Sequence, residues 1–161
     1  MRKYKLTDKT ITIMCNGAEV TLHQIEALQD FADVKAGDLG GYVESEKNLA
    51  HEGDCWVGGK ARIYGDAKVH GNARVYDNAE VSGFAEVHGC AKVSNNAEVY
   101  GNTDVYGNAW IFGNALVYDN AEVYGNAKVY GEAEVFGNAW VYGNAEVGGS
   151  SKVCGDTELG V

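Results

Sequence analysis

Proline is absent from the 161 residues of this chain, whereas glycine occurs 22 times. Because proline cannot supply the turns, glycine and asparagine must make them. Long apolar runs are also missing: the N-terminal stretch "MRKYKLTDKTITIMCNG" carries charges, and its apolar part "ITIMC" is too short for the core of a signal peptide. Because no run approaches the length of a membrane span, we expect a cytoplasmic protein that does not bind a membrane.

Positive charge is scarce. Lysine and arginine total 13 against 23 aspartate and glutamate residues, so the formal net charge is −10. A protein that binds nucleic-acid backbones in general needs a basic surface. This composition therefore argues against general nucleic-acid binding.

Cysteine occurs four times, at widely spaced positions without a C-x-x-C pair: Cys15, Cys55, Cys90 and Cys154. Zinc sites and disulfide frameworks have characteristic spacings that are missing here. We therefore interpret the cysteines as reduced thiols, as in most cytoplasmic proteins.

A six-residue repeat fills most of the chain. An aliphatic residue recurs at every sixth position from Val57 to Leu159 without a gap, and a small residue, mostly alanine, lies two positions before it. In the unit 121–124, "AEVY", alanine and valine alternate with glutamate and tyrosine, which is typical of a strand with one buried face. The following Gly125 and Asn126 supply a tight corner, because both tolerate a positive φ.

The repeat predicts a parallel β-helix rather than a series of hairpins. A two-residue hairpin would place Tyr124 opposite Ala127 on one face, and it would therefore mix the exposed and buried positions. A coil that turns the same way at every corner keeps them apart. Three six-residue sides then close one turn, so that residue i lies under residue i+18, with rungs about 4.8 Å apart.

This pattern resembles the hexapeptide repeat of left-handed β-helix proteins, in which an aliphatic residue precedes a small one by four positions, as Val123 precedes Ala127. The resemblance covers residues 49–160 and implies an all-β fold, a left-handed parallel β-helix of about six 18-residue coils. Its left hand follows from the resemblance alone, because the usual crossover rule predicts a right-handed coil. One departure is Tyr124, at a place where the commoner repeat has glycine.

The first 44 residues do not repeat, and we expect a small α+β cap over 1–44, before the β-helix of 45–161. The stretch "KYKLTDKTITI" predicts a strand or short hairpin. The stretch "TLHQIEALQDF" predicts a helix, with Thr21 and Gln24 as a capping box and an apolar stripe of Leu22, Ile25 and Leu28. Because terminal repeats need capping, we expect these residues to cover the first coil. This region resembles that of phage and prophage hexapeptide-repeat proteins, which are often labelled acyltransferases.

Stacking at i+18 sorts the outward side chains into three faces. The face that we call the acidic face holds mainly carboxylates beside histidine and tyrosine: Glu86, Asp104, Glu122, Trp140, His70, His88, Tyr106 and Tyr124. The face that we call the basic face holds lysine beside aromatic residues: Lys92, Trp110, Lys128, Phe112 and Tyr130. Three copies around a threefold axis could join the acidic face of one to the basic face of the next, and the exposed aromatic residues would form the apolar centre of that interface. The alternative is that the aromatic columns only stiffen the coil by stacking.

The resemblance also implies a possible chemistry. Many left-handed β-helix proteins are acyltransferases, which use CoA donors, bind substrates between the subunits of a trimer, and use a histidine as general base. His88 and His70 are the candidates here, with acetyl-CoA as donor. Against catalysis, no projecting loop interrupts the repeat, and both histidines occupy a column that elsewhere holds tyrosine. Glu86 and the two histidines could ligate zinc, but repetition alone makes such clusters, so we expect no metal.

The sequence therefore favours a non-catalytic binding or assembly protein. We expect a homotrimer whose faces or clefts bind a bacterial host protein or an anionic, nucleotide-like ligand, without a cofactor. From the resemblance, its setting would be a phage or prophage, with a role against host defence. The alternative function is a CoA-dependent acyltransferase.

Overall fold

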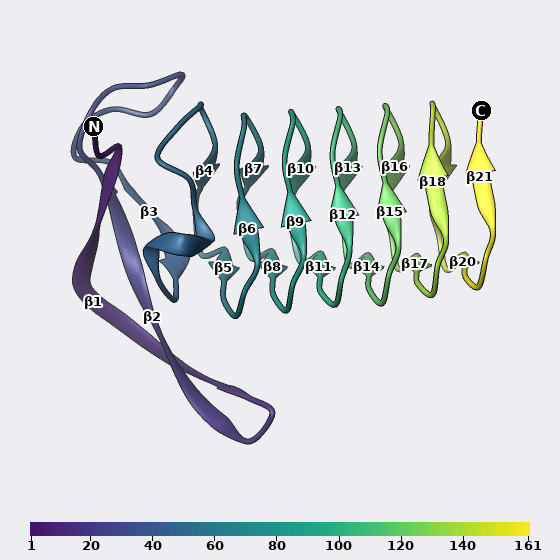
Figure 1. Cartoon of the computed structure of the whole chain (residues 1–161), viewed down its shortest axis with the longest axis horizontal. Helices are drawn as coiled ribbons and strands as arrows, with labels where there is room; N and C mark the ends of the chain where they lie inside the picture. The colour runs from purple at the N-terminus through teal and green to yellow at the C-terminus, as the bar shows by residue number, and fades with distance from the viewer.

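The computed structural model describes all 161 residues, which form a long coil with a hairpin at its N-terminal end (Figure 1). The coil is built from short strands separated by tight corners, and the C-terminus lies at the opposite end. The strands are β4 (Trp56–Val57), β5 (Arg62–Ile63), β6 (Lys68–Val69), β7 (Arg74–Val75), β8 (Glu80–Val81), β9 (Glu86–Val87), β10 (Lys92–Val93), β11 (Glu98–Val99), β12 (Asp104–Val105), β13 (Trp110–Ile111), β14 (Leu116–Val117), β15 (Glu122–Val123), β16 (Lys128–Val129), β17 (Glu134–Val135), β18 (Trp140–Tyr142), β19 (Glu146–Val147), β20 (Lys152–Val153) and β21 (Glu158–Gly160).

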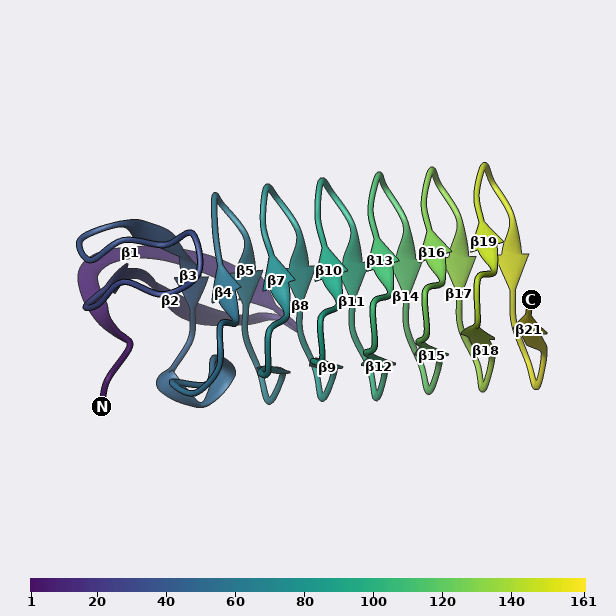
Figure 2. The same ribbon diagram turned by 90° about the horizontal axis from the view of Figure 1, so that it is seen from above.

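The strands form three sheets that run along the coil (Figure 2). Two sheets have six strands each, and the third has nine, because β1, β2 and β3 extend it. Parallel partners lie 18 residues apart, as in Lys92 with Trp110 and Asp104 with Glu122. The predicted β-helix with an 18-residue coil is confirmed, whereas its handedness stays a prediction.

The core is the inward column of alanine and valine. Ala121 and Val123 have 0% of their surface exposed, whereas Glu122 and Tyr124 between and after them are partly exposed. Backbone N–H groups of one rung donate to carbonyl oxygens of the next rung, as Lys92 N does to the Ala109 carbonyl oxygen at 2.9 Å. Small inward residues leave the coil narrow, and most outward side chains lie on its flat faces, although Trp56 and Ser94 are buried.

The predicted N-terminal helix is wrong: residues 18–27 form β2 (Ala18–Ala27), which pairs antiparallel with β1 (Tyr4–Cys15). Asn16 and Gly17, with φ of 51° and 80°, make the turn between them, which is a common hairpin sequence. Thr21, taken as a helix cap, pairs with Thr12 across the hairpin. The spacing of the apolar residues in this segment fits both a helix and a strand. Pairing with β1 on one side and β3 on the other stabilises the strand.

The N-terminal residues close the first coil. After β2, a loop leads to β3 (Leu39–Val43), which pairs with β5, and a 3₁₀ turn (η1, Glu46–Asn48) precedes the repeat. Lys3 is 1% exposed, and its ammonium donates to the carbonyl oxygens of Cys55 at 2.7 Å and Gly53 at 3.2 Å. β3 belongs to the same sheet as the repeat strands, so this sheet crosses from the predicted cap into the coil. The predicted division into a cap of residues 1–44 and a β-helix of residues 45–161 stays a prediction.

No helix of the structure has the length and hydropathy needed to cross a membrane.

His51 makes the stability of this closed end depend on pH. Its Nδ1 accepts a hydrogen bond from the backbone N–H of Lys3, and its ring stacks on Tyr4 at 4.3 Å. Burial, followed by the nearby Arg2 and Lys3, lowers the pKa of His51 below its usual value. A lowered pKa contributes stability that is present above the unfolded-state pKa of about 6.5 and is lost as the pH falls through the folded-state value.

We therefore expect the melting temperature to fall as the pH is lowered from about 7.5 to about 5.5, because protonated His51 can no longer accept the hydrogen bond from the backbone N–H of Lys3. His51→Gln keeps an acceptor but does not titrate, so its melting temperature should fall less over this range. Circular dichroism melts of both proteins measure the difference. An equal fall in the variant would assign the pH dependence to other groups.

Candidate functional site

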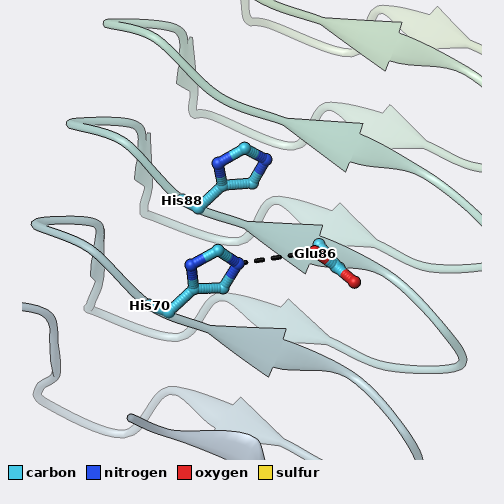
Figure 3. A group of neighbouring side chains, drawn as sticks. All are labelled: His70, Glu86 and His88. Carbon is cyan, nitrogen blue, oxygen red and sulfur yellow. Dashed lines mark hydrogen bonds and ion pairs between the residues drawn. The ribbon is translucent and has the colours of Figure 1, made fainter. Parts of the chain in front are cut away.

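The acidic face carries a continuous column of stacked rings. His70 stacks on His88 with ring centroids 4.7 Å apart and planes 4° from parallel, and His88 stacks on Tyr106 at 5.2 Å. Tyr106 and Tyr124 continue the column at 4.9 Å. Each ring follows the buried valine of its strand, so the constant period of the repeat places it above the ring one coil earlier (Figure 3). The column is therefore a direct product of the repeat.

Three of these rings, His70, His88 and Tyr106, also contact a carboxylate of the next coil, 16 residues further along. The Nε2 atom of His70 lies 3.4 Å from Glu86 Oε2, and that of His88 lies 2.7 Å from Asp104 Oδ1. The hydroxyl of Tyr106 donates to Glu122 at 3.5 Å. The sequence placed Glu86 beside His88, whereas in the structure Glu86 lies within hydrogen-bonding distance of His70, and Asp104 of His88.

Tyr106 and Tyr118 remain protonated donors over the whole physiological range. Burial, followed by the charge of Glu122, raises the pKa of Tyr106. On the neighbouring face, burial and the hydrogen bond to Glu134 raise the pKa of Tyr118 to about 12. A hydroxyl in this setting can donate a hydrogen bond but does not serve as a base near neutral pH.

His88 is the residue of the acidic face best suited to proton transfer. Its side chain is 28% exposed, against 42% for His70, and it makes the shorter bond to a carboxylate. With Nε2–H donating to Asp104, the lone pair of His88 lies on Nδ1, where it can accept a proton from a bound molecule. An imidazole whose orientation and tautomer are held by a carboxylate is the usual arrangement of a histidine base.

Glu86, His70 and His88 also form the group with metal-ligand chemistry, because their donor atoms all lie within 4.8 Å of one another. However, the two imidazole rings are almost parallel. Nitrogen lone pairs lie in the ring plane, so these two point in the same direction and do not converge on one ion without ring rotation. The expectation of no metal stays a prediction.

The basic face belongs to a different sheet from the acidic face. Its Lys92 ammonium lies 5.7 Å from the Trp110 ring, which packs on Phe112 at 4.4 Å. Phe112 stacks on Tyr130 at 5.2 Å, and Lys128 pairs with Glu146 at 3.5 Å. Within one chain the two predicted groups of residues do not meet, so a cleft between them requires a second copy and stays a prediction. Trp140 also lies on the acidic face, next to Glu122 in the ladder.

A hollow of about 670 Å³ lies at the N-terminal end of the basic face, beneath the loop between β2 and β3. The sequence pattern did not predict this hollow, because its loop residues do not repeat. The available signal was Gly58, a residue without a ring at the start of a column that continues with Tyr76. The side chains that line it include Asp33, Leu39, Trp56, Arg74, Tyr76 and Lys92.

Comparison with known proteins adds one relative. No protein-family model matches the chain. A segment of 61 residues, 35% of this chain, is 43% identical to a protein of Escherichia coli (strain K12) named "Uncharacterized acetyltransferase YdcK". The match spans 19% of that relative, so the chain corresponds to about a fifth of its length. The unbroken six-residue repeat, the three parallel sheets and this match together fit the hexapeptide-repeat family of left-handed β-helix proteins.

Proposed function

We propose that the chain transfers an acyl group from a CoA thioester to an amine or hydroxyl, with His88 as general base. The observation that carries this proposal is the 2.7 Å contact between His88 Nε2 and Asp104 Oδ1, which leaves Nδ1 as proton acceptor. The partial match to a relative named as an acetyltransferase supports the same chemistry.

In this reaction, the acceptor heteroatom attacks the thioester carbonyl while His88 Nδ1 takes the proton of the acceptor. The C–S bond then breaks, and the CoA thiolate receives a proton from the imidazolium. Asp104 holds the Nε2 proton throughout and stabilises the positive charge that develops on the ring. The products are the acylated acceptor and CoA thiol, so the atoms and charges balance without a metal or redox partner.

The acidic face is flat in a single chain, so we propose that three copies build the site. Because rotation about a threefold axis parallel to the coil preserves height, His88 of one copy would lie opposite the coil of the next copy that carries Lys92 and the hollow beside it. A cleft of this kind excludes water and supplies cations for the phosphates of CoA. Light scattering after gel filtration tests the assembly, and a monomeric mass would contradict it.

The test of activity uses acetyl-CoA with a panel of amino sugars, polyamines and hydroxylated antibiotics, followed by mass spectrometry of the acceptors. Direct detection of product avoids thiol reagents, which would react with the exposed Cys90 and Cys154. We expect one acceptor to gain an acetyl group at the expense of acetyl-CoA. If no acceptor is acetylated and acetyl-CoA does not raise the melting temperature of the protein, the proposal is wrong.

A second candidate is a binding or assembly protein without catalysis. The observation that favours it is the uniform coil, in which no insertion projects between β4 and β21. Moreover, the contact made by His88 recurs in coils without histidine, as between Tyr118 and Glu134 at 2.9 Å. A stable trimer that neither binds nor uses acetyl-CoA would support this candidate. A phage setting and a role against host defence stay predictions from resemblance.

A further inference from the structure

Tyr76 lacks the stacking partner that most rings of the aromatic columns have. The histidines and aromatic residues that follow the buried aliphatic stack on a ring one coil away, with two exceptions, Tyr64 and Tyr76. Tyr64 donates to Glu80 at 3.1 Å, and Cys15 and Asn16 of the hairpin lie beside it. Tyr76 has neither kind of partner, and it faces the hollow beneath the loop between β2 and β3.

Tyr76 has no ring to stack on because its column has Gly58 in the preceding coil and Ser94 in the following coil. Glycine also occupies the corresponding position at Gly148 in this column and at Gly160 on the acidic face, but there the tyrosine ring of the previous coil lies where a Cβ would be. At Gly58 a Cβ would meet Tyr76 Cβ at 3.7 Å, Trp56 Cδ1 at 3.8 Å and Trp56 Nε1 at 4.0 Å, which are ordinary contacts. The column therefore has an open slot of ring size over Gly58.

The polar residue next to this slot is a cation, whereas the rings that hydrogen-bond to the following coil contact carboxylates. Rings in the columns contact the residue 16 positions further along, which is a carboxylate for Tyr64, His70, His88, Tyr106 and Tyr118. For position 58 that residue is Arg74. A carboxylate favours a ring that donates a hydrogen bond, whereas a guanidinium favours a ring that carries an anionic hydrogen-bond acceptor.

The cations of the hollow are available to such an anion. Arg74 pairs with Asp33 at 2.7 Å, but the Asp33 side chain is 81% exposed, so water and ligands compete for this contact. Lys92 makes no ion pair and lies near the Trp110 ring at 5.7 Å. The other carboxylate, Asp38, accepts the backbone N–H of Lys35 at 2.9 Å. The volume of about 670 Å³ falls within the range of small-molecule sites.

We propose that this hollow binds a planar aromatic or heteroaromatic group that carries a phosphate or a carboxylate. The ring lies in the slot over Gly58 and stacks on Tyr76, and the anionic group contacts Lys92 and displaces Asp33 from Arg74. The hollow and Lys92 also border the cleft of the proposed acyltransferase, but this site lies within one chain and its binding test needs neither acetyl-CoA nor His88. The two proposals can therefore fail separately.

Two probes distinguish the possible sources of such a ligand: AMP for nucleotides and 2-naphthoate for aromatic carboxylates. Isothermal titration calorimetry with the full chain should show that at least one binds. Adenosine, which has a ring without the anion, and inorganic phosphate, which has the anion without a ring, should each bind at least about tenfold more weakly than the better probe. Failure of both probes, or equal binding of either control compound, would overturn the proposal.

Gly58→Tyr supplies the missing ring from the protein itself and should weaken the better probe about tenfold or more. The variant restores the regular column, so its melting temperature should equal or exceed that of the natural chain. Ser82→Tyr is the matched control, because it adds the same ring to a gap on another sheet and should leave affinity unchanged. Unchanged affinity in a folded Gly58→Tyr variant contradicts the site.

The charge of the site is tested by Asp33→Asn, which releases Arg74 and removes a competing carboxylate. Binding of the better probe should tighten about two- to fivefold, whereas Arg74→Gln should weaken it. Binding of adenosine should change in neither variant. A loss of affinity in Asp33→Asn would show that the hollow selects a cation, and it would overturn the anionic ligand. Light scattering on each variant checks that the oligomeric state is unaltered.

Discussion

Replacement of His88 by alanine is expected to lower the rate constant for acetyl transfer about 10²- to 10⁴-fold, which is the usual contribution of a general base. His70→Ala should lower it less than about tenfold, because His70 is the more exposed ring and its contact with Glu86 is 3.4 Å rather than 2.7 Å. Both variants remove one ring from the same stacked column, so His70→Ala controls for the loss of stacking. The measurement is steady-state acetylation of the acceptor identified with the natural chain.

Asp104→Asn separates orientation from simple packing. The amide of asparagine can donate to Nε2 of His88, which would place the imidazole proton on Nδ1 and remove the acceptor needed for catalysis. We therefore expect a large loss of rate with a nearly unchanged melting temperature. Glu122→Gln, which alters the corresponding partner of Tyr106, should retain the rate. Full activity of His88→Ala would exclude His88 as the base, and an inactive His70→Ala would assign the role to His70.

The second large effect concerns the corners of the coil. Gly107 has φ of 67°, and a Cβ there would lie 2.9 Å from the backbone nitrogen of Gly125 in the next coil. Gly107→Val should lower the free energy of unfolding by about 1–3 kcal/mol from backbone strain alone, and the close contact adds to this loss. Chemical denaturation followed by circular dichroism measures the change.

Gly107→Asn should be tolerated much better than valine. Asn95 and Asp119 occupy the same place in other coils, with φ of 56° and 62°. Their side-chain oxygens accept the backbone N–H of the residue one coil further along, Gly113 at 3.0 Å and Gly137 at 3.1 Å. Asparagine at 107 can accept the same hydrogen bond from the backbone N–H of Gly125, and this bond offsets the energetic cost of the left-handed backbone conformation. Equal losses for valine and asparagine would show that crowding, and not φ, limits this corner.

The repeat could be translated into three dimensions because it recurs at a constant spacing without interruption from Val57 to Leu159. A strict six-residue unit gives each aliphatic residue, such as Val105 and Val123, the same direction and the same partner. Register then needs no information from distant parts of the chain. The residues of the acidic and basic faces could be assigned to columns for the same reason.

The N-terminal segment lacked this redundancy. The spacing of Leu22 and Ile25 fits a helix, but Gln24 between them is buried and donates to the carbonyl oxygen of Gly40 at 3.1 Å. That contact exists only because β3 lies beside β2. A single short segment with both periods is decided by the surface against which it packs, and this surface is distant in the sequence.

By itself, the sequence determined the coil, its inward column and the identity of the outward residues, because a six-residue repeat converts position directly into direction. Only the tertiary structure decided which of these residues act together. The rings lean toward the following coil, so His88 meets Asp104 and not its strand neighbour Glu86. Likewise, the gap at Gly58 becomes a hollow only because the non-repeating loop carrying Asp33 folds back over it. Contacts across coils and between unrelated segments depend on side-chain geometry and packing, which the period of a sequence does not contain.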